Sequence, residues 1–189
     1  METTLDAVKD DIDRLLTDAA DNRKSPMHTP VVATADADAR IMVLRAFDPE
    51  ARTLRFHTDA RAPKTAVIAS DAAVGVLFYD REKQVQLRCR GHARIETATP
   101  AAEDAWNHSD AYARRCYLGD PPGRPSERPT SGLPAWVEGE RPTDKQLRPA
   151  RDNFAVLFVE LQTIDWYKLA NDGHRRAIFE NGRGRWVTP

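Results

Sequence analysis

The sequence has little cysteine, no long apolar run and no excess of charge of one sign. Its 189 residues include 2 cysteines, and 28 Lys and Arg nearly balance 29 Asp and Glu, for a formal net charge of −1. A non-specific nucleic-acid binder carries a clear basic excess, so we expect no nucleic-acid partner. No segment approaches the ~20 apolar residues that span a membrane, so we expect no membrane partner and a cytoplasmic protein.

Several familiar chemical sites are also missing. Cys89 and Cys116 lie far apart without CxxC spacing, so the sequence indicates neither a disulfide framework nor a zinc site. Both fall in predicted elements, so buried free thiols are expected. The 5 histidines are scattered without HExxH spacing, so no metal site is predicted. GxGxxG, GxxxxGK[ST] and GxSxG are absent, which removes support for Rossmann, P-loop and nucleophile-elbow enzymes.

The hydrophobic pattern predicts one mainly β (α+β) domain over residues 1–189. Residues 1–22 are an expected N-terminal helix, because apolar residues recur at helical spacing and Thr4 can cap it. Strands are expected mostly as neighbours and hairpins, in about seven segments: 41–48, 53–59, 72–80, 83–97, 153–169, 174–180 and 183–189. This order favours an antiparallel barrel with two or three peripheral helices over a doubly wound parallel sheet.

Other segments carry more specific expectations. The continuous apolar run over 72–80 predicts a buried strand, and Gly91 predicts a bulge or bend in the strand that follows. A helix that begins near Pro100 is expected to continue to Cys116 along one stripe. Residues 119–150 read as a Pro-rich loop, and a loop of this length is either functional or disordered.

Near its end the chain combines a hairpin with a tryptophan and cations. Asn181-Gly182 is the favoured pair of a type I′ turn. Upstream, Trp166 is followed by His174 and Arg176. One interpretation is a solvent-facing hairpin with Trp166 in the core. The other is a clamp of aromatic and cationic groups on an anionic ligand.

Cations and polar side chains also gather at the ends of successive predicted strands. Arg40 and Arg45 flank an apolar stretch. His57 and Thr58 end the next strand, and Lys64 lies at a helix start. An ammonium group and the N–H groups of a helix N-terminus both favour an anion, so a phosphate site is a hypothesis for this segment. Each cation alone is more often solvated surface, and their clustering weakens that interpretation without removing it.

These residues resemble the pyridoxamine 5′-phosphate oxidase superfamily, the FMN-binding split barrels. The family motif R-x-V-L-x-K is similar to RIMVLR at 40–45, with Arg45 in place of the lysine. The motif (F/Y)-x-T-N followed by S-R-K is similar to FHTD at 56–59 followed by APK at 62–64. Only the lysine of that last triplet is kept.

Two further motifs follow in the same order. The family's R-Q-V is similar to KQV at 83–85. Its late tryptophan, with histidine and arginine eight and ten residues on, is similar to Trp166, His174 and Arg176. The resemblance covers roughly residues 30–189 and implies an antiparallel split β-barrel with peripheral helices.

The resemblance implies a homodimer with FMN at its interface. Arg40 and Lys64 would hold the phosphate with help from Thr58, and Gln84 would bond the flavin. The 40–44 strand would line the isoalloxazine ring, while Trp166 and Arg176 would reach in from the other subunit. The implied cofactor-binding residues are Arg40, Ile41, Met42, Val43, Leu44, Arg45, His57, Thr58, Lys64, Gln84, Trp166 and Arg176. A small-molecule substrate would exchange a hydride with the flavin, with His174 as the candidate for proton transfer.

The resemblance fails at the substrate residues. Asp172 lies where the oxidase has an arginine, and Y-x-x-x-R-P-x-x-S has no clean counterpart. An FMN-dependent oxidoreductase with a different substrate, covered by the 119–150 loop, is therefore the first hypothesis. The alternatives are a non-catalytic flavin-binding module, or a split barrel that binds heme or a deazaflavin. Heme binding would need His28, His92 or His108 as ligand, and nothing in the sequence selects one.

Overall fold

The computed structural model describes residues 4–189, so the first three residues of the expected helix 1–22 lie outside the described part. The chain divides into two compact units. The first contains residues up to 56, 71–94 and 158–189, and the second contains 57–70 and 95–157. This division into compact units does not test the expectation of one domain over 1–189, which stays a prediction.

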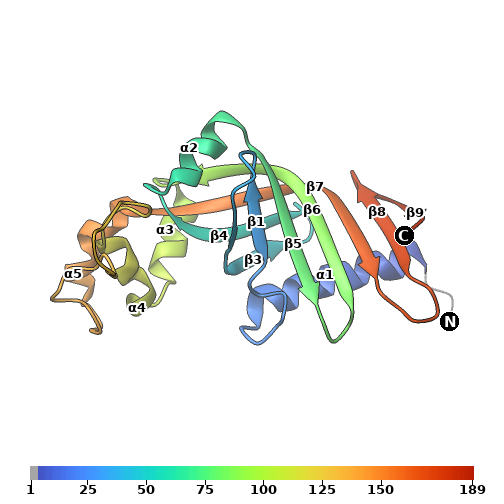
Figure 1. Ribbon diagram of the computed structural model, residues 1–189, viewed down its shortest axis with the longest axis horizontal. Coiled ribbons are helices and arrows are strands. Elements are labelled where there is room, and N and C mark those ends of the chain that lie inside the picture. Colours follow the sequence, from blue (N-terminus) through green and yellow to red (C-terminus); the bar gives the residue numbers. More distant parts are fainter. Residues whose placement is uncertain (1–3) are drawn as a thin grey trace. The chain divides into compact units, whose positions relative to one another are not determined.

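Nine strands form one sheet within residues 4–189 (Figure 1). The order is β2-β1-β5-β6-β7-β4-β3, with β8 paired to β7 and β9 to β8. The expected antiparallel sheet with peripheral helices is confirmed. The strands are β1 (Val31–Thr34), β2 (Ala39–Ile41), β3 (Leu44–Asp48), β4 (Thr53–Asp59), β5 (Ala73–Asp80), β6 (Val85–Glu96), β7 (Phe154–Lys168), β8 (Arg175–Glu180) and β9 (Arg183–Val187).

The helices are mostly short. They are α1 (Leu5–Asp21), α2 (Pro63–Ser70), α3 (Pro100–Asn107), α4 (Ala111–Arg114) and α5 (Asp144–Leu147), with 3₁₀ turns η1 (Arg115–Leu118) and η2 (Arg148–Asn153). The predicted cap of α1 is confirmed, because the Ala7 amide donates to Thr4 Oγ1 at 3.2 Å. Within the described residues, none of these helices combines the length and apolar character that crossing a membrane requires.

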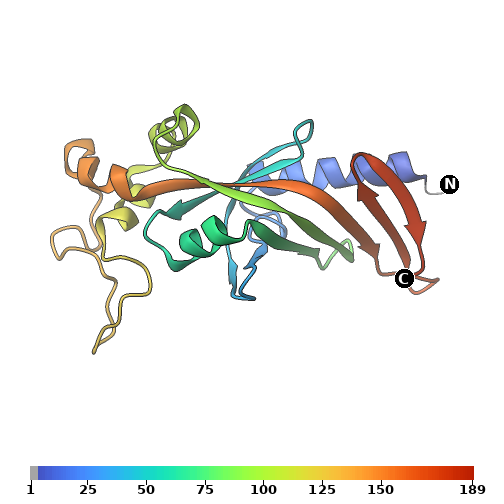
Figure 2. The ribbon, with the colours of Figure 1, turned by 90° about the horizontal axis from the view of Figure 1, so that it is seen from above.

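The first unit has its core between α1 and the sheet. The apolar stripe of α1 is fully buried, at Val8, Ile12, Leu15, Leu16 and Ala19. The helix contacts β3 and β9, and Figure 2 shows it running alongside the β8–β9 hairpin. Asn181 and Gly182 have φ of 49° and 76°, as a type I′ turn requires, so the predicted hairpin turn is confirmed.

The single strand predicted over 41–48 is wrong, because two strands share this segment. The chain leaves β2 after Ile41 and enters β3 at Leu44. In between, the Met42 amide donates to Pro30 O at 3.0 Å, and the Leu44 amide donates to His28 O at 2.9 Å. The backbone therefore stays hydrogen-bonded through the break. The β3–β4 register shifts between Leu44 and Ala46, which makes Arg45 the extra residue of a β-bulge.

Two predictions about the central strands are also wrong. Strand β5 is not buried on both faces, because its burial alternates and Leu77 and Tyr79 are exposed. No bulge occurs at Gly91 in the β5–β6 pairing, since the register runs through it without a shift. A Cβ at Gly91 would lie 2.1 Å from Glu160 O, so the glycine admits the close backbone of β7.

The second unit contains the remaining helices and a cluster of rings. The Phe154 ring lies 5.4 Å from Trp106, 5.1 Å from Tyr117 and 5.0 Å from His57. The single helix predicted up to Cys116 is wrong, because α4 begins separately and Cys116 is exposed. The 119–150 segment is irregular over most of its length, although α5 and η2 begin before its end.

Candidate functional site

The segment from Arg40 to Arg45 alternates between core and surface. Met42 and Leu44 are buried, with 8% and 0% exposure. Ile41 is 69% exposed, and Val43 is half-buried. An exposed isoleucine beside a half-buried valine gives the outward side an apolar surface, which suits one face of a flat, largely apolar ring.

The Arg40 guanidinium is held inside the β1–β2 hairpin. Its Nη1 donates to Val32 O at 3.2 Å and to Thr34 Oγ1 at 3.1 Å, and Nη2 forms an ion pair with Asp38. The carboxylate of Asp38 offsets much of this positive charge. A phosphate would therefore compete with Asp38 for Arg40, which the sequence pattern alone did not indicate.

An apolar row crosses the outward face of the first unit. In the antiparallel register, Val31 lies opposite Ile41 on one side and Leu77 on the other. Directly opposed residues point to the same face, so these three side chains lie side by side. Tyr79, two residues beyond Leu77, shares that face, and Leu77 and Tyr79 are 39% and 44% exposed. The sequence alone did not indicate this row, because the residues of β5 are apolar on both faces and only their burial alternates.

Arg176 is anchored by a carboxylate on the neighbouring strand. Its Nε and Nη2 donate to Asp165 Oδ1 and Oδ2 at 3.0 and 2.8 Å. Arg88 of β6 bonds the same carboxylate. Burial acts to raise the pKa of Asp165, but hydrogen bonds from Arg176 and Arg88 outweigh it and hold the pKa below its usual value. The cluster of Asp165, Arg88 and Arg176 thus carries a net positive charge.

Trp166 and Arg176 do not lie together on one face. Trp166 opposes Ala177, and Arg176 opposes Tyr167, so the strand alternation sends the two side chains to opposite faces. Trp166 is 4% exposed and packs edge-on against Trp186 at 6.5 Å. Its buried Nε1 has no hydrogen-bond partner within residues 4–189. Within one chain, this arrangement agrees better with a solvent-facing hairpin that has Trp166 in the core than with a clamp of Trp166 and Arg176 on one ligand.

His174 and Gln84 both lie in turns. His174 is exposed after β7, where its Nδ1 accepts a hydrogen bond from the Ala170 amide at 3.2 Å. Gln84 precedes β6 with a φ of 52°, and its carbonyl accepts from the Leu169 amide at 2.9 Å. The side chain of Gln84 is exposed, and the hydrogen bond fixes its backbone.

In the second unit, the end of β4 and the start of α2 bring the predicted phosphate ligands close in sequence. Thr58 is buried, and Lys64 is the second residue of α2. Between them, Arg61 Nε and Nη2 donate to Asp59 Oδ1 and Oδ2 at 2.9 and 2.7 Å. Hydrogen bonding to Asp59 raises the pKa of Arg61, which keeps its guanidinium charged. An ammonium group such as that of Lys64 and the N–H groups of a helix N-terminus are both groups that favour an anion.

The remaining histidines have structural partners. His57 contacts the Phe154 ring. The buried His28 places Nδ1 2.7 Å from Ala19 O, and His92 and His108 contact Gln162 and the Asp104 carbonyl. Within the described residues, no group of three metal-ligating side chains gathers.

Each unit, taken by itself, offers one kind of group that a flavin nucleotide needs. The first unit offers an apolar surface at Ile41 and Val43 with the cations Arg40 and Arg45 beside it. The second offers Lys64 on the first turn of α2. A flavin ring needs the first kind of surface and a phosphate needs the second.

Similarity to known proteins suggests a flavin cofactor. Residues 10–97 match the family model described as pyridoxamine 5′-phosphate oxidase, FMN-binding domain. No curated protein sequence matches the chain. Among solved structures, a pyridoxamine 5′-phosphate oxidase-related, FMN-binding protein of Nostoc punctiforme has a TM-score of 0.73 at 18% identity, over 100% of both chains.

Two more solved structures share the fold. PhzG of Burkholderia lata, solved with tetrahydrophenazine-1-carboxylic acid, has a TM-score of 0.66 at 16% identity, over 94% of this chain and 90% of its own. A Clostridium acetobutylicum protein related to general stress protein 26, of the pyridoxinephosphate oxidase family, has a TM-score of 0.52 at 9% identity, over 95% and 93%. The predicted split-barrel fold is confirmed by these similarities.

Proposed function

Because the chain belongs to the pyridoxamine 5′-phosphate oxidase-like FMN-binding domain family, we propose that it is an FMN-dependent oxidoreductase that works as a homodimer. Bound FMN would supply hydride acceptance and the return of electrons to oxygen or another acceptor. The observation that carries the proposal is the segment 40–45, which joins an exposed apolar surface to two arginines within the matched region.

The residues of this chain would bind and orient the cofactor. Ile41 and Val43 would cover one face of the ring, and Arg45 would be directed by its β-bulge. Lys64 would bind the phosphate with Thr58 beside it. Arg176, held by Asp165, would place a guanidinium beside the flavin of the partner subunit, where it would favour the negative charge of the reduced ring.

The apolar row supports the homodimer. Ile41, Leu77 and Tyr79 expose large apolar side chains together on one strand face. Contiguous exposed apolar surface marks interaction sites. The family resemblance implies that a second copy would bring its own Arg176 to the 40–45 segment of the first copy, and we propose that the two copies meet at this row.

Pyridoxamine phosphate is not the substrate that the residues favour. Asp172 stands where the oxidase has an arginine, and it pairs with Arg175 at 3.1 Å. A carboxylate there would repel a substrate phosphate. We therefore propose a small organic substrate without a phosphate at that position. The same observation favours the second candidate, a flavin-binding module without turnover.

FMN titration of site variants tests the proposal. Lys64→Met and Arg45→Met are expected to weaken FMN binding about tenfold each, because each removes a charged donor. Lys24→Met is the matched control, since Lys24 lies exposed in the loop after α1. Equal FMN affinity in all three variants and the wild type would contradict the assigned binding residues. Anaerobic bleaching by a substrate separates the oxidoreductase from the module, which would bind FMN and stay oxidised.

A further inference from the structure

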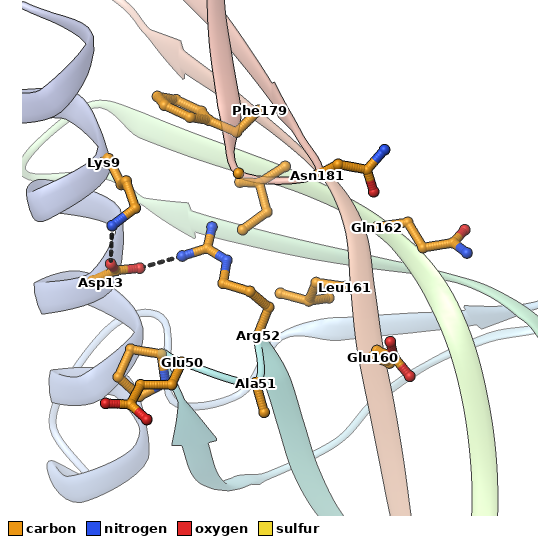
Figure 3. A pocket seen from close by; sticks show the side chains of 13 residues that line it. Lys9, Asp13, Glu50, Ala51, Arg52, Glu160, Leu161, Gln162, Phe179 and Asn181 are labelled. Atoms are coloured by element: carbon orange, nitrogen blue, oxygen red, sulfur yellow. Dashed lines mark hydrogen bonds and ion pairs between the residues drawn. The ribbon is translucent and has the colours of Figure 1, made fainter.

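A cavity of about 550 Å³ lies within the first unit, apart from the predicted cofactor-binding residues. Its walls come from α1, the turn between β3 and β4, the middle of β7 and the β8–β9 hairpin (Figure 3). Small-molecule sites measure roughly 300–1,000 Å³, so the volume suits a ligand of modest size. None of the residues assigned to FMN lines this cavity.

One side of the cavity is apolar. Leu161, Ile164 and Phe179 line it and are 8%, 2% and 6% exposed. These side chains belong to the core of the first unit, so the surface they offer is fixed by packing. A hydrophobic ring or short chain that packs against them would be shielded from water. This burial stabilises binding by roughly 25 cal/mol per Å² of buried apolar area.

The opposite side carries two cations on one carboxylate. Lys9 Nζ lies 3.6 Å from Asp13 Oδ2, and Arg52 Nη1 bonds Asp13 Oδ1. Figure 3 shows Arg52 reaching toward α1 to meet Asp13, while the carboxylate of Glu160 points away from this contact. The net charge of this group is +1, from Lys9, Arg52 and Asp13.

Arg52 binds its carboxylate through a different edge of the guanidinium from Arg61 and Arg176. Arg61 and Arg176 each bind a carboxylate through both Nε and Nη2. Arg52 meets Asp13 through Nη1, and within residues 4–189 its Nε and Nη2 have no hydrogen-bond acceptor. The side chain is 24% exposed. The Nε–Nη2 edge, which Arg61 and Arg176 use for carboxylates, is therefore open in Arg52.

The backbone at Arg52 is also unusual. Its φ of 52° lies in the left-handed region, where glycine or asparagine is the ordinary residue. Its carbonyl accepts the Leu161 amide at 2.8 Å, which fixes the turn against β7. Holding an arginine in this backbone conformation costs free energy. Its guanidinium lies in the wall of the cavity.

We propose that this cavity binds a small organic monocarboxylate with an aromatic or aliphatic body. The carboxylate would take the Nε–Nη2 edge of Arg52 as a bidentate pair. The body would lie against Leu161, Ile164 and Phe179. Glu50 and Glu160 also line the cavity, so a dianion such as a phosphate monoester is disfavoured. This preference separates the cavity from the proposed FMN phosphate site.

The test is titration of the purified protein, with and without saturating FMN, by three naphthalene probes. 2-Naphthoate is expected to bind at one saturable site and to shift the Arg52 and Gly182 amides in ¹H–¹⁵N spectra. 2-Naphthamide and 2-naphthyl phosphate are expected to bind at least tenfold more weakly. Added FMN is expected to leave the 2-naphthoate affinity unchanged, so the result does not depend on the proposed flavin function.

Variants separate the cavity from general adsorption. Arg52→Met is expected to weaken 2-naphthoate binding at least tenfold, and Arg52→Lys less, because lysine keeps the charge without the fork. Ala51→Trp keeps every charge and is expected to block the cavity from its exposed rim. Arg23→Met, in an exposed loop, is the control. The proposal is overturned if 2-naphthoate does not bind, or if Arg52→Met and Ala51→Trp bind it as well as Arg23→Met.

Discussion

Replacing Asp165 by asparagine tests whether the Arg176 arm is held by its carboxylate. Asp165 accepts two bonds from Arg176, at 3.0 and 2.8 Å, and one from Arg88. Asparagine removes the negative charge and turns an amide N–H₂ toward guanidinium donors. Breaking a fully buried ion pair costs about 3–5 kcal/mol, but Arg88 and Arg176 are 47% and 27% exposed and can regain water. We therefore expect a loss of about 1.5–3 kcal/mol in the free energy of unfolding.

The same hairpin supplies a matched control. Asp172 pairs with Arg175 at 3.1 Å, and both side chains are exposed, at 71% and 45%. Exposed pairs contribute about 0–1 kcal/mol, so Asp172→Asn is expected to change little. Urea denaturation at neutral pH measures both variants. Equal effects of the two substitutions would refute the role given to Asp165.

The pH dependence gives a second readout for Asp165. Its pKa is lower in the folded than in the unfolded chain, so the stabilisation is present above the unfolded pKa. It is lost as the pH falls through the folded pKa, because the protonated carboxyl no longer pairs with the arginines. The difference between wild type and Asp165→Asn is therefore expected to shrink in acid. A constant difference down to strongly acidic pH would contradict the ion-pair explanation.

Three further predictions concern other parts of the chain. Burial raises the pKa of Cys89 to about 12, so a thiol reagent at pH 8 is expected to label exposed Cys116 and to reach Cys89 only after unfolding. Gly91→Ala is expected to lower stability by about 3 kcal/mol or more in thermal unfolding, since its Cβ would meet Glu160 O; an unchanged melting temperature would refute that contact. Ile41→Asp is expected to shift a dimer to monomer in sedimentation without unfolding it, and a dimer that persists would argue against the apolar row.

Much of the fold follows from local patterns. Strand β4 keeps its predicted bounds of 53–59, and α1 its predicted stripe, because period-two and helical spacing act over neighbouring residues. The wrong predictions concern contacts between segments that are distant in the sequence. An apolar run cannot reveal that one face of β5 is left uncovered within the chain. Gly91 reads as a bulge because the approaching backbone of Glu160 is about 70 positions away in sequence.

In the candidate site too, local patterns selected residues but did not give their contacts. Motif spacing selected Arg40, Trp166 and Arg176, but spacing carries no information on what each side chain touches. The structure gives Arg40 the neighbour Asp38 and Arg176 the neighbour Asp165. It also buries Trp166 on the face opposite Arg176. Strand alternation placed Asp165 on the face of Arg176, and a check of cross-strand diagonals in the sequence would have found that pair.

The most direct test of the flavin assignment is a visible absorption spectrum of the purified protein, followed by identification of the released cofactor. We expect a yellow protein that releases FMN, with binding weakened by Lys64→Met and Arg45→Met. A colourless protein that also fails to take up added FMN would contradict the flavin assignment.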